Sequence, residues 1–429
     1  MDKALLIKVL KKEIEKSTGC TDPGAVALAV AKATAVLGEK PDQIRVSVSP
    51  NVYKNGISVG VPGTGQRGLH QAAALGIYLS DWTDEDLGLL DHVNTEIVRA
   101  SQELLKAKRV EVSYLKQTPD PLYIKAEVGK GANQAWTVIQ GDYSNITETG
   151  KNTQTLFSKP VEKAEGGVDE LIHYKIADII GAIKSMDLEE LRFLIEDAFI
   201  NKAAAEEGMG NENAVMGDAL SGMIEEAKFP CSAMMLGKLY TASAAEARMI
   251  GLNVPIMAIA GSGNHGITNF LGVLAAAETL KVPEVELAKA LAISSSITIY
   301  IKGRIKRMTA FCGCSVAAAT GVAAATVYLL GGSFEDMVNA MHSVLGALAG
   351  IVCDGAKESC AYKLSTATAT AIEYAFLATK KKVFIPRGNG IVSHTIEHTF
   401  EKLGQLNNPG MVETDKCLLE IIEEIQAQK

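Results

Sequence analysis

The first forty residues carry the hydrophobic spacing of two helices. Over residues 3–16 the apolar side chains recur three or four positions apart, which is the spacing of one face of an α-helix. Gly19 follows, and glycine commonly ends a helix. A second helix is predicted over residues 23–37, with Thr21 or Asp22 as its N-cap and a proline at its first position.

The pattern then changes to an alternation of apolar and polar residues. Residues 43–49 and 56–61 alternate with period two, and residues 54–56, Lys-Asn-Gly, lie between them. This arrangement predicts two strands joined by a turn that uses Asn-Gly. Further strand-like runs occupy residues 109–115, 122–128 and 135–140. Residues 1–165 are therefore expected to form an α+β domain.

The remainder of the chain lacks strand patterns of this kind. A polar stretch over residues 159–169, with Pro160 and a pair of glycines, indicates a domain boundary. Beyond it, helical spacing extends over residues 171–198, 203–226, 233–250, 268–280, 285–296, 316–330, 334–353 and 364–378. Many of these segments are rich in alanine, which allows helices to approach closely at little cost in side-chain entropy. We expect an α+β fold, with a larger all-helical domain over residues 166–429.

Composition and charge narrow the class of protein. Hydrophobic residues make up 47% and charged residues 21% of the chain, as in an ordinary globular protein. The net charge of -8 and the absence of a basic cluster argue against nucleic acid as a partner. Residues 309–334 carry no charge, yet they lack the Leu- and Ile-rich centre of a membrane span. A packed interior helix is expected there, and no membrane partner.

The cysteines are the residues with the clearest chemical potential. The chain has seven, and its N-terminus does not resemble a signal peptide, so a reducing, cytoplasmic location is expected. Cys312, Cys314, Cys353 and Cys360 lie close together in the sequence beside Gly and Asp residues. Paired Cys-x2-4-Cys knuckles of zinc sites are missing, whereas three or four thiolates from separate helix ends suit an iron–sulfur cubane. Packing cysteines in alanine-rich helices are the alternative.

Cys20 stands apart, in the break between the two N-terminal helices. Unpaired backbone N–H groups and the helix dipole favour an anion at such a position, so the pKa of its thiol is expected to be lowered. A thiolate there could serve as a base, a nucleophile or a ligand. A small buried residue in a turn would explain the same position.

Residues 260–266, Ala-Gly-Ser-Gly-Asn-His-Gly, follow an apolar run and precede a helix. They match the G-x-G-x-x-G pattern of nicotinamide-binding folds, but the parallel βαβ context of that pattern is missing. A glycine-rich helix start that holds a carboxylate is the preferred interpretation, with Asn264 and His265 directed at the ligand. Residues 394–398 also spell H-x-x-E-H, the inverted zinc-peptidase motif, which arises easily by chance.

Taken together, these motifs resemble one known family. Segments 19–23, 54–56, 62–64, 261–266, 312–314 and 353–360 occur in the order seen in the L-cysteine desulfidase and serine dehydratase alpha-chain-like family, and the resemblance covers nearly the whole chain. Its members are iron–sulfur lyases that work without pyridoxal phosphate. They convert L-cysteine to pyruvate, ammonia and sulfide, or L-serine to pyruvate and ammonia.

The resemblance implies roles for individual residues. It implies a [4Fe-4S] cluster held by Cys312, Cys353 and Cys360, with Cys314 as an alternative to Cys312, and one iron left open for substrate. The proton acceptor of the family falls on Cys20. We further expect the substrate carboxylate to be held by Lys54, Asn55, Ser262, Gly263, Asn264 and His265. The soft thiol leaving group favours L-cysteine over L-serine.

A different class of function fits the same residues. A non-catalytic iron–sulfur redox sensor or regulatory binding protein would keep the cluster ligands and lack turnover. A small amino acid is the expected partner, and the alanine-rich helices are compatible with a homo-oligomer.

Overall fold

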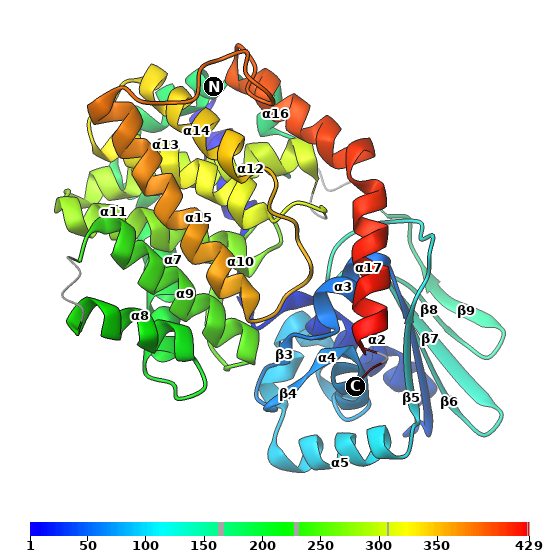
Figure 1. The fold of residues 1–429 in the computed structure, drawn as a ribbon. Coiled ribbons are helices and arrows are strands. Elements are labelled where there is room, and N and C mark those ends of the chain that lie inside the picture. Colours follow the sequence, from blue (N-terminus) through cyan, green and yellow to red (C-terminus); the bar gives the residue numbers. More distant parts are fainter. Residues whose placement is uncertain (162–166, 227–230, 307–308, 427, 429) are drawn as a thin grey trace.

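The computed structural model describes residues 1–161, 167–226, 231–306, 309–426 and 428. Figure 1 shows a helical part, which carries the N-terminus, beside a smaller part that carries a twisted sheet. The prediction of an α+β fold is confirmed.

The sheet has six strands in the order β5-β2-β6-β7-β8-β9. Their bounds are β2 (Gln43–Val48), β5 (Val110–Tyr114), β6 (Tyr123–Lys130), β7 (Asn133–Gln140), β8 (Ile146–Lys151) and β9 (Gln154–Ser158). β2 runs parallel to β5 and antiparallel to β6, with Val46 opposite Ala126. The apolar face packs on helix α2 (Thr21–Leu37), which is buried along most of its length. The polar residues that alternate with apolar ones along β2 and β6 therefore lie on the face of the sheet turned away from α2.

The segment between the first two predicted strands is helical. The predicted hairpin between residues 43–49 and 56–61 is wrong, because residues 50–56 form helix α3 (Pro50–Gly56). Pro50 stands at the first helical position after Ser49, where a proline is well suited to begin a helix. Lys54 and Asn55 therefore lie in a helix. Only β3 (Gly60–Val61) follows, and it pairs with β4 (Gln66–Arg67).

The rest of the sheet-bearing part is helical. It comprises α4 (Gly68–Gly76), the 3-10 helical segment η1 (Ser80–His92) and α5 (Thr95–Lys106). α4 and η1 contact α2. The second predicted helix begins two residues earlier than expected, at Thr21, so the N-cap position is Cys20 and not Thr21 or Asp22.

The helical part contains most of the remaining elements. They are η2 (Leu171–His173), α6 (Ile176–Lys184), α7 (Leu188–Met209), α8 (Val215–Glu225), α9 (Ala233–Ile250), α10 (Gly263–Gly266), η3 (Ile267–Leu271), α11 (Gly272–Leu280), α12 (Glu284–Ile305), η4 (Cys314–Ala318), α13 (Ala319–Leu329), α14 (Phe334–Leu348), α15 (Ser359–Phe376), η5 (Leu377–Lys381), α16 (Ile396–Gln405) and η6 (Leu406–Gly410). η3 and η4 are π-helical turns, a geometry found often at functional sites.

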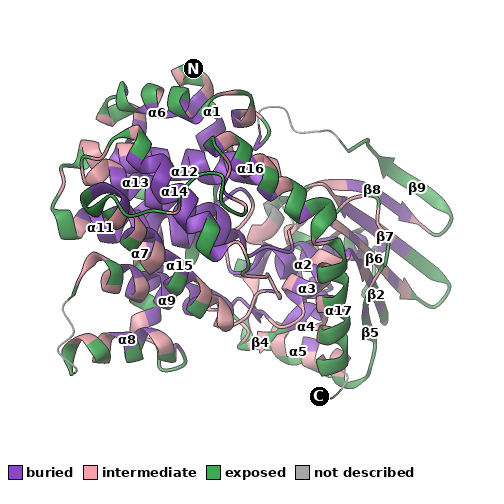
Figure 2. Cartoon of the chain, turned by 45° about the horizontal axis from the view of Figure 1, so that its top comes forward, coloured by how far each residue is buried: buried purple, intermediate pink, exposed green. Residues whose placement is uncertain are grey.

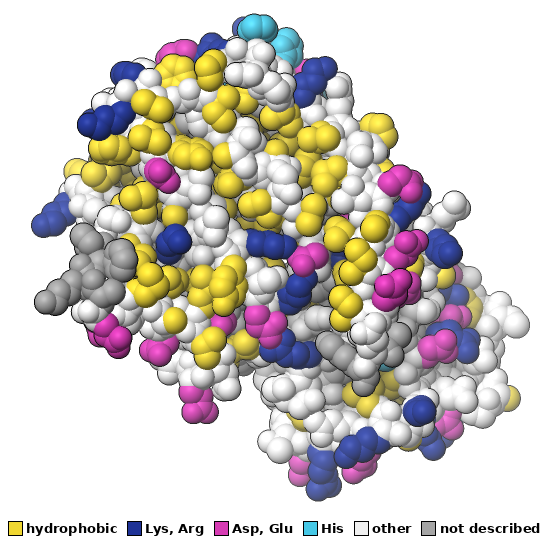
Figure 3. Space-filling view, viewed as in Figure 1, with side chains coloured by type: hydrophobic (Ala, Val, Ile, Leu, Met, Phe, Trp, Pro, Cys, Tyr) yellow, Lys and Arg dark blue, Asp and Glu magenta, His cyan; other side chains and the backbone are white. Residues whose placement is uncertain are grey.

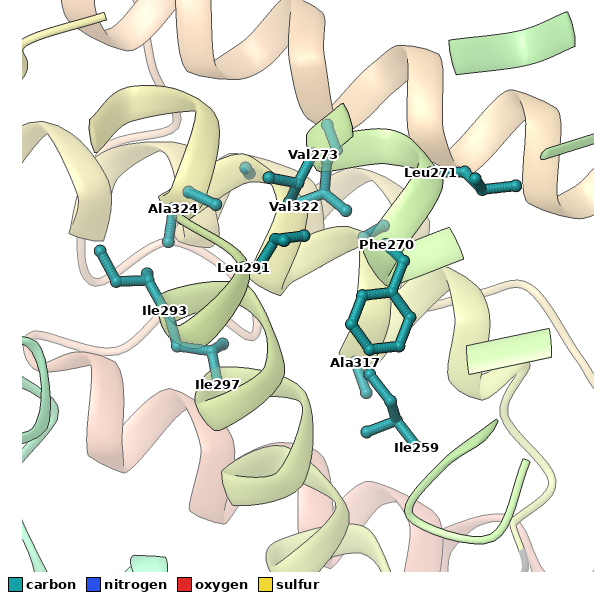
Figure 4. Packing of buried hydrophobic residues seen from close by; sticks show 14 of the residues in the cluster. Ile259, Phe270, Leu271, Val273, Leu291, Ile293, Ile297, Ala317, Val322 and Ala324 are labelled. Atoms are coloured by element: carbon teal, nitrogen blue, oxygen red, sulfur yellow. The ribbon is translucent and has the colours of Figure 1, made fainter. Parts of the chain in front are cut away.

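These helices enclose one large core. α12 and α13 are buried at its centre (Figure 2), and Phe270, Leu291 and Val322 from three neighbouring elements pack together there (Figure 4). The uncharged segment predicted as an interior helix is α13 with η4 before it. Within the described residues, no helix is long and apolar enough to cross a membrane.

The N-terminal helix packs in the helical part, and the C-terminal helix packs on the sheet-bearing part. Helix α1 (Lys3–Glu13) packs in the helical core, and β1 (Ile14–Thr18) pairs antiparallel with β10 (Pro255–Ile259). In the opposite direction, α17 (Val412–Gln426) lies along the sheet-bearing part beside α3 (Figure 1). Tyr114 of β5 donates a hydrogen bond to Glu423 on this helix (3.1 Å). The predicted boundary at residues 165/166 lies outside the described residues.

Side chains of different kinds gather on different parts of the surface. On the face shown in Figure 3, hydrophobic side chains are concentrated over the helical part. Tyr362 and Phe376 of α15 are among the exposed large hydrophobic residues.

Candidate active site

A cavity of about 220 Å³ opens between the two parts of the molecule. The helical part and the sheet-bearing part both contribute to its wall, which includes Tyr143 from the loop after β7 and Arg248 from α9. Five of the seven cysteines line it: Cys20, Cys312, Cys314, Cys353 and Cys360. Residues that are far apart in the sequence therefore meet at one site.

Backbone pairing joins the segments that carry Cys312 and Cys353. Phe311 and Val352 form an isolated antiparallel bridge. On either side of it, the N–H of Cys312 donates to the carbonyl of Ile351 (2.8 Å), and the N–H of Cys353 donates to the carbonyl of Ala310 (2.7 Å). The two cysteines are thereby fixed in register by main-chain hydrogen bonds, before any ligand is considered.

The third cysteine of this group comes from the first turn of α15. The loop that leads to it turns at Gly355, whose φ of +96° favours glycine. A Cβ on this glycine would lie 2.2 Å from the carbonyl oxygen of Lys54. The close approach brings α3 and the cysteine loop together, and the Cys360 thiol then donates to the Gly355 carbonyl (3.7 Å).

Charges flank this loop on its outer side. Asp354 forms ion pairs with Lys357 (2.6 Å) and Lys363. Lys363 also donates to the carbonyl of Val352 (3.0 Å), next to Cys353. These contacts tie the segment to α15.

The thiols of the group differ in acidity. A hydrogen bond from the Cys314 thiol lowers the pKa of Cys312, and the same contact raises the pKa of Cys314 well above its ordinary value. Burial raises the pKa of Cys360 to about 12. Cys312 is therefore the member of the Cys-x-Cys pair that carries the negative charge more readily.

Cys312, Cys314, Cys353 and Cys360 line the cavity from separate segments of the chain. In the described part of the chain, no group of three or more His, Cys, Asp or Glu side chains is placed to hold a metal ion. The sulfur donors are soft ligands, which select iron–sulfur clusters, zinc or copper(I).

Cys20 occupies the N-cap position of α2 and is buried. Its thiol donates to Oδ2 of Asp22 (3.5 Å), and the hydroxyl of Tyr143 donates to Oδ1 of the same carboxylate (3.3 Å). Burial, together with the nearby charge of Asp22, raises the pKa of Cys20 to about 12. The expected lowering is therefore wrong, because desolvation and a neighbouring anion outweigh the helix N-terminus.

Asp22 is itself a buried acid. Burial raises the pKa of its carboxyl group to about 6, against the stabilising hydrogen bond from Cys20 and the charge of Arg248. The pair therefore carries its negative charge on the carboxylate and its proton on sulfur. Sequence reasoning considered Asp22 only as a helix cap, and it missed Tyr143.

The glycine-rich loop lies on the other wall of the cavity. β10 ends at Ile259, and the chain turns through Ala260 and Gly261, which both have positive φ. Ser262 and Asn264 line the cavity. Gly263 does not line it, but a Cβ at this position would lie 2.6 Å from Nε of Arg248.

His265 also lines the cavity and is held by the strand before the loop. Its Nδ1 lies 3.1 Å from the carbonyl of Ile259, so this nitrogen carries the proton and Nε2 is an acceptor. Burial, with the charge of Lys302, lowers the pKa of His265 to about 3. The imidazole is therefore neutral at physiological pH.

The two residues predicted from the 54–56 segment have different positions. Asn55 lines the cavity, whereas the Nζ of Lys54 is buried in an ion pair with Asp415 of α17. The side chain of Lys54 is not part of the cavity wall. Its contact with substrate stays a prediction.

Arg248 was missed by sequence reasoning. It lies near the end of α9, is 3% exposed and donates to the carbonyl of Gly19 (3.0 Å) and to Oδ1 of Asn264 (2.9 Å). The available signal was a charged residue in a helix segment that is otherwise rich in Ala and Ser. Lys302 of α12, buried at the same cavity, was missed in the same way.

Two other motifs have structural surroundings that differ from those their sequence patterns require. β10 pairs antiparallel with β1, so the glycine-rich loop does not belong to a parallel βαβ unit. In the H-x-x-E-H segment, Oε1 of Glu397 accepts a hydrogen bond from the N–H of Ile176 (3.1 Å). Neither nicotinamide binding nor a zinc peptidase gains support from these contacts.

Comparison with known proteins places the chain in a family. A family model described as serine dehydratase alpha chain matches residues 92–420. A "UPF0597 protein" of Methanocella arvoryzae is 50% identical over 422 residues, which cover 98% of this chain and 99% of that protein. A second "UPF0597 protein", from Alkaliphilus oremlandii, is 36% identical over 428 residues and covers 99% of each chain. The chain belongs to the serine dehydratase alpha chain family.

Proposed function

We propose that the protein is an iron–sulfur-dependent lyase that works without pyridoxal phosphate. It would eliminate the β-substituent of L-cysteine to give pyruvate, ammonia and sulfide, or that of L-serine to give pyruvate and ammonia. The observation that carries the proposal is that Cys20 and the four clustered cysteines open on one cavity. The thiol that would accept the proton and the thiols that would bind the metal thus lie on the wall of one cavity.

The cysteine donors suit a [4Fe-4S] cluster. Thiolates that surround a volume match a cubane, whose irons lie at separate corners. Cys312, Cys353 and Cys360 would hold it, and the lowered pKa of Cys312, together with its main-chain hydrogen bond to Ile351, supports Cys312 over Cys314. When bound, the cluster would supply an iron that acts as a Lewis acid on the leaving group.

The chain's own residues would move the α-proton. The neutral thiol of Cys20 must first pass its proton to Asp22 Oδ2, to which it is already hydrogen-bonded. The raised pKa of Asp22, about 6, makes this carboxylate a better acceptor than an ordinary aspartate. The Cys20 thiolate can then take the proton from the α-carbon of the substrate, as a general base.

The glycine-rich loop and α3 would position the substrate. Ser262, Asn264, His265 and Asn55 line the cavity, and Gly263 leaves room for Arg248 beside them. The neutral, fixed imidazole of His265 has its proton on Nδ1, so its Nε2 would accept a hydrogen bond from the substrate ammonium group and would not hold the carboxylate. We keep these residues as the proposed substrate-binding set.

The identity of the leaving group belongs to the proposal as well. The family match carries the name serine dehydratase, while a sulfur leaving group suits the soft character of iron. We therefore propose L-cysteine as the preferred substrate and L-serine as the alternative. Thiolate-held iron also requires a reducing compartment, which supports a cytoplasmic location.

The test is pyruvate release by protein purified without oxygen. We expect turnover of L-cysteine or L-serine, and Cys20→Ala should abolish it while leaving the visible absorption of the cluster unchanged. Bleaching of the cluster in Cys20→Ala would instead make Cys20 a ligand. A full cluster with no turnover of any amino acid would favour the non-catalytic redox sensor.

A further inference from the structure

Arg248 is a buried cation that makes no direct ion pair with a carboxylate of the described residues, although its charge acts on Asp22 nearby. Both of its hydrogen-bond acceptors, the Gly19 carbonyl and the Asn264 amide oxygen, are uncharged. No ion pair within 4.0 Å joins Arg248 to a carboxylate of the described residues. A buried charge is costly unless it is paired and hydrogen-bonded.

The guanidinium of Arg248 lines the cavity and has N–H donors that the two hydrogen bonds above do not use. A guanidinium has about five N–H donors, and the two contacts above use only part of them. Arg248 is among the residues that line the cavity, so the remaining donors can be reached by a ligand there. Arginine binds carboxylates through paired, parallel hydrogen bonds.

The surroundings hold this side chain in place. The bond from Nε to the Gly19 carbonyl fixes Arg248 next to Cys20. Asn264 holds Nη1 from the other side, and a Cβ on Gly263 would lie 2.6 Å from Nε. The guanidinium is therefore pre-organised, which reduces the entropy that binding would cost.

We propose that Arg248, oriented by Asn264 and the Gly19 carbonyl, binds the α-carboxylate of the amino-acid substrate. This inference rests on the proposed function, because it assumes an amino acid in the cavity. The carboxylate carbon is bonded to the α-carbon, and the residue that holds Arg248 directly precedes Cys20. Anchoring the carboxylate here brings the α-proton towards the Cys20 sulfur.

The experiment measures binding and does not depend on turnover. L-Alanine has the carboxylate and ammonium groups of the substrate but no leaving group, and L-alaninamide lacks the carboxylate. Both are titrated into the anaerobically purified protein by calorimetry, and iron per chain is measured in each sample. We expect wild-type protein to bind L-alanine at least ~10-fold more tightly than L-alaninamide, about the loss of one charged hydrogen-bonding contact.

The sharpest variant is Asn264→Asp. It is nearly isosteric and keeps an oxygen on Nη1 of Arg248, so the tie to Gly19 is preserved. It also supplies a built-in counter-ion, which should weaken L-alanine binding by ~10-fold or more, because the cation is then already paired. Because the new carboxylate would also repel L-alanine directly from the cavity wall, weaker binding supports the inference only where Arg248→Lys shows it as well.

Two further variants complete the set. Arg248→Lys keeps the charge but loses the paired donors, so its L-alanine binding should also weaken. Arg304→Gln is the matched control: Arg304 also donates to a backbone carbonyl, that of Ile172 (3.1 Å), but it does not line the cavity. Its binding of L-alanine should equal that of wild type.

Several results would overturn the inference. The first is a wild-type protein that binds L-alaninamide as tightly as L-alanine. The second is that Asn264→Asp and Arg248→Lys both bind L-alanine as tightly as wild type does, with unchanged iron content. The proposed function fails separately. If the protein binds L-alanine selectively but releases pyruvate from no amino acid, the role of Arg248 stands and the lyase proposal fails. If both variants turn over substrate with unchanged KM, the lyase proposal stands and the role of Arg248 fails.

Discussion

The imidazole of His265 lies directly against Gly313, the residue between Cys312 and Cys314. A Cβ at position 313 would be 2.1 Å from Nε2 of His265, much closer than two atoms can approach without a bond. The hydrogen bond between Nδ1 and the Ile259 carbonyl keeps the ring in this position. The glycine-rich loop and the Cys-x-Cys turn therefore fit together only because residue 313 has no side chain.

This contact predicts that Gly313→Ala disturbs the cysteine site. Either the His265 ring or the turn that carries Cys312 must move, and overpacking of this kind typically costs about 1–3 kcal/mol. We expect most of the bound iron to be lost, as measured by iron per chain after anaerobic purification. Gly350→Ala is the control, since a Cβ there would meet nothing within 4 Å. Full iron content in Gly313→Ala would contradict the proposed placement of the cluster.

The choice between Cys312 and Cys314 is tested by two serine variants. Cys312 is fixed in register with the segment that carries Cys353 by main-chain hydrogen bonds, and its pKa is the lowered one of the Cys-x-Cys pair. Cys312→Ser should therefore bleach the visible absorption of the cluster, and Cys314→Ser should retain it. The opposite pattern would make Cys314 the ligand.

The raised pKa of Asp22 predicts how the activity falls at low pH. The carboxyl has a pKa of about 6, and only its ionised form can accept the proton of Cys20. The kcat/KM value should therefore fall as the pH drops below about 6. Asp22→Asn should lose about 10²-fold or more of the turnover, the usual worth of a positioned proton acceptor. Normal turnover in Asp22→Asn, with the cluster present, would remove this carboxylate from the mechanism.

His342 predicts a pH dependence of stability far from the cavity. The residue is fully buried on α14, and Nε2 lies 3.0 Å from Oγ1 of Thr399. Burial, with the charge of Arg387, lowers its pKa from 6.5 to about 4. The unfolded chain takes up the proton first as the pH falls. Up to about 3 kcal/mol of stability, present above pH 6.5, should therefore be lost as the pH falls towards 4.

The measurement is urea unfolding at pH 7 and pH 5, with all proteins in the same cluster state. His342→Gln should show a smaller loss of stability between the two values than wild type. His398→Gln removes an exposed histidine and should behave as wild type does. An unchanged pH dependence in His342→Gln would show that His342 does not titrate as its burial requires.

Local patterns located most of the helical regions, because each helix carries its own periodicity, but they missed some breaks: the helices predicted over residues 171–198 and 203–226 each run across the gap between two helices of the structure. The segment predicted over residues 233–250 is α9, with the same bounds. Pairing between distant segments produces no local sequence pattern of this kind. β1 and β10 lie more than two hundred residues apart in the sequence, and the first residues of β1 were assigned to the predicted N-terminal helix over residues 3–16. The Asn-Gly pair at 55–56 outweighed the signal of Pro50, which in fact begins a helix.

The candidate site shows the same division. The cysteines could be selected because their residue type is rare and their neighbours are turn-forming. Arg248 could not, since its importance depends on burial and on Gly19, more than two hundred residues away. The pKa of Cys20 was misjudged for a related reason. The helix N-terminus is visible in the sequence, but burial and the orientation of the Asp22 carboxylate are not.

The central claim is that the clustered cysteines hold a [4Fe-4S] cluster beside Cys20. The most direct test is the content of iron and acid-labile sulfide per chain in protein purified without oxygen. The account predicts about four of each. Neither element, even after anaerobic reconstitution with iron and sulfide, would contradict it, and the lyase proposal would fall with it.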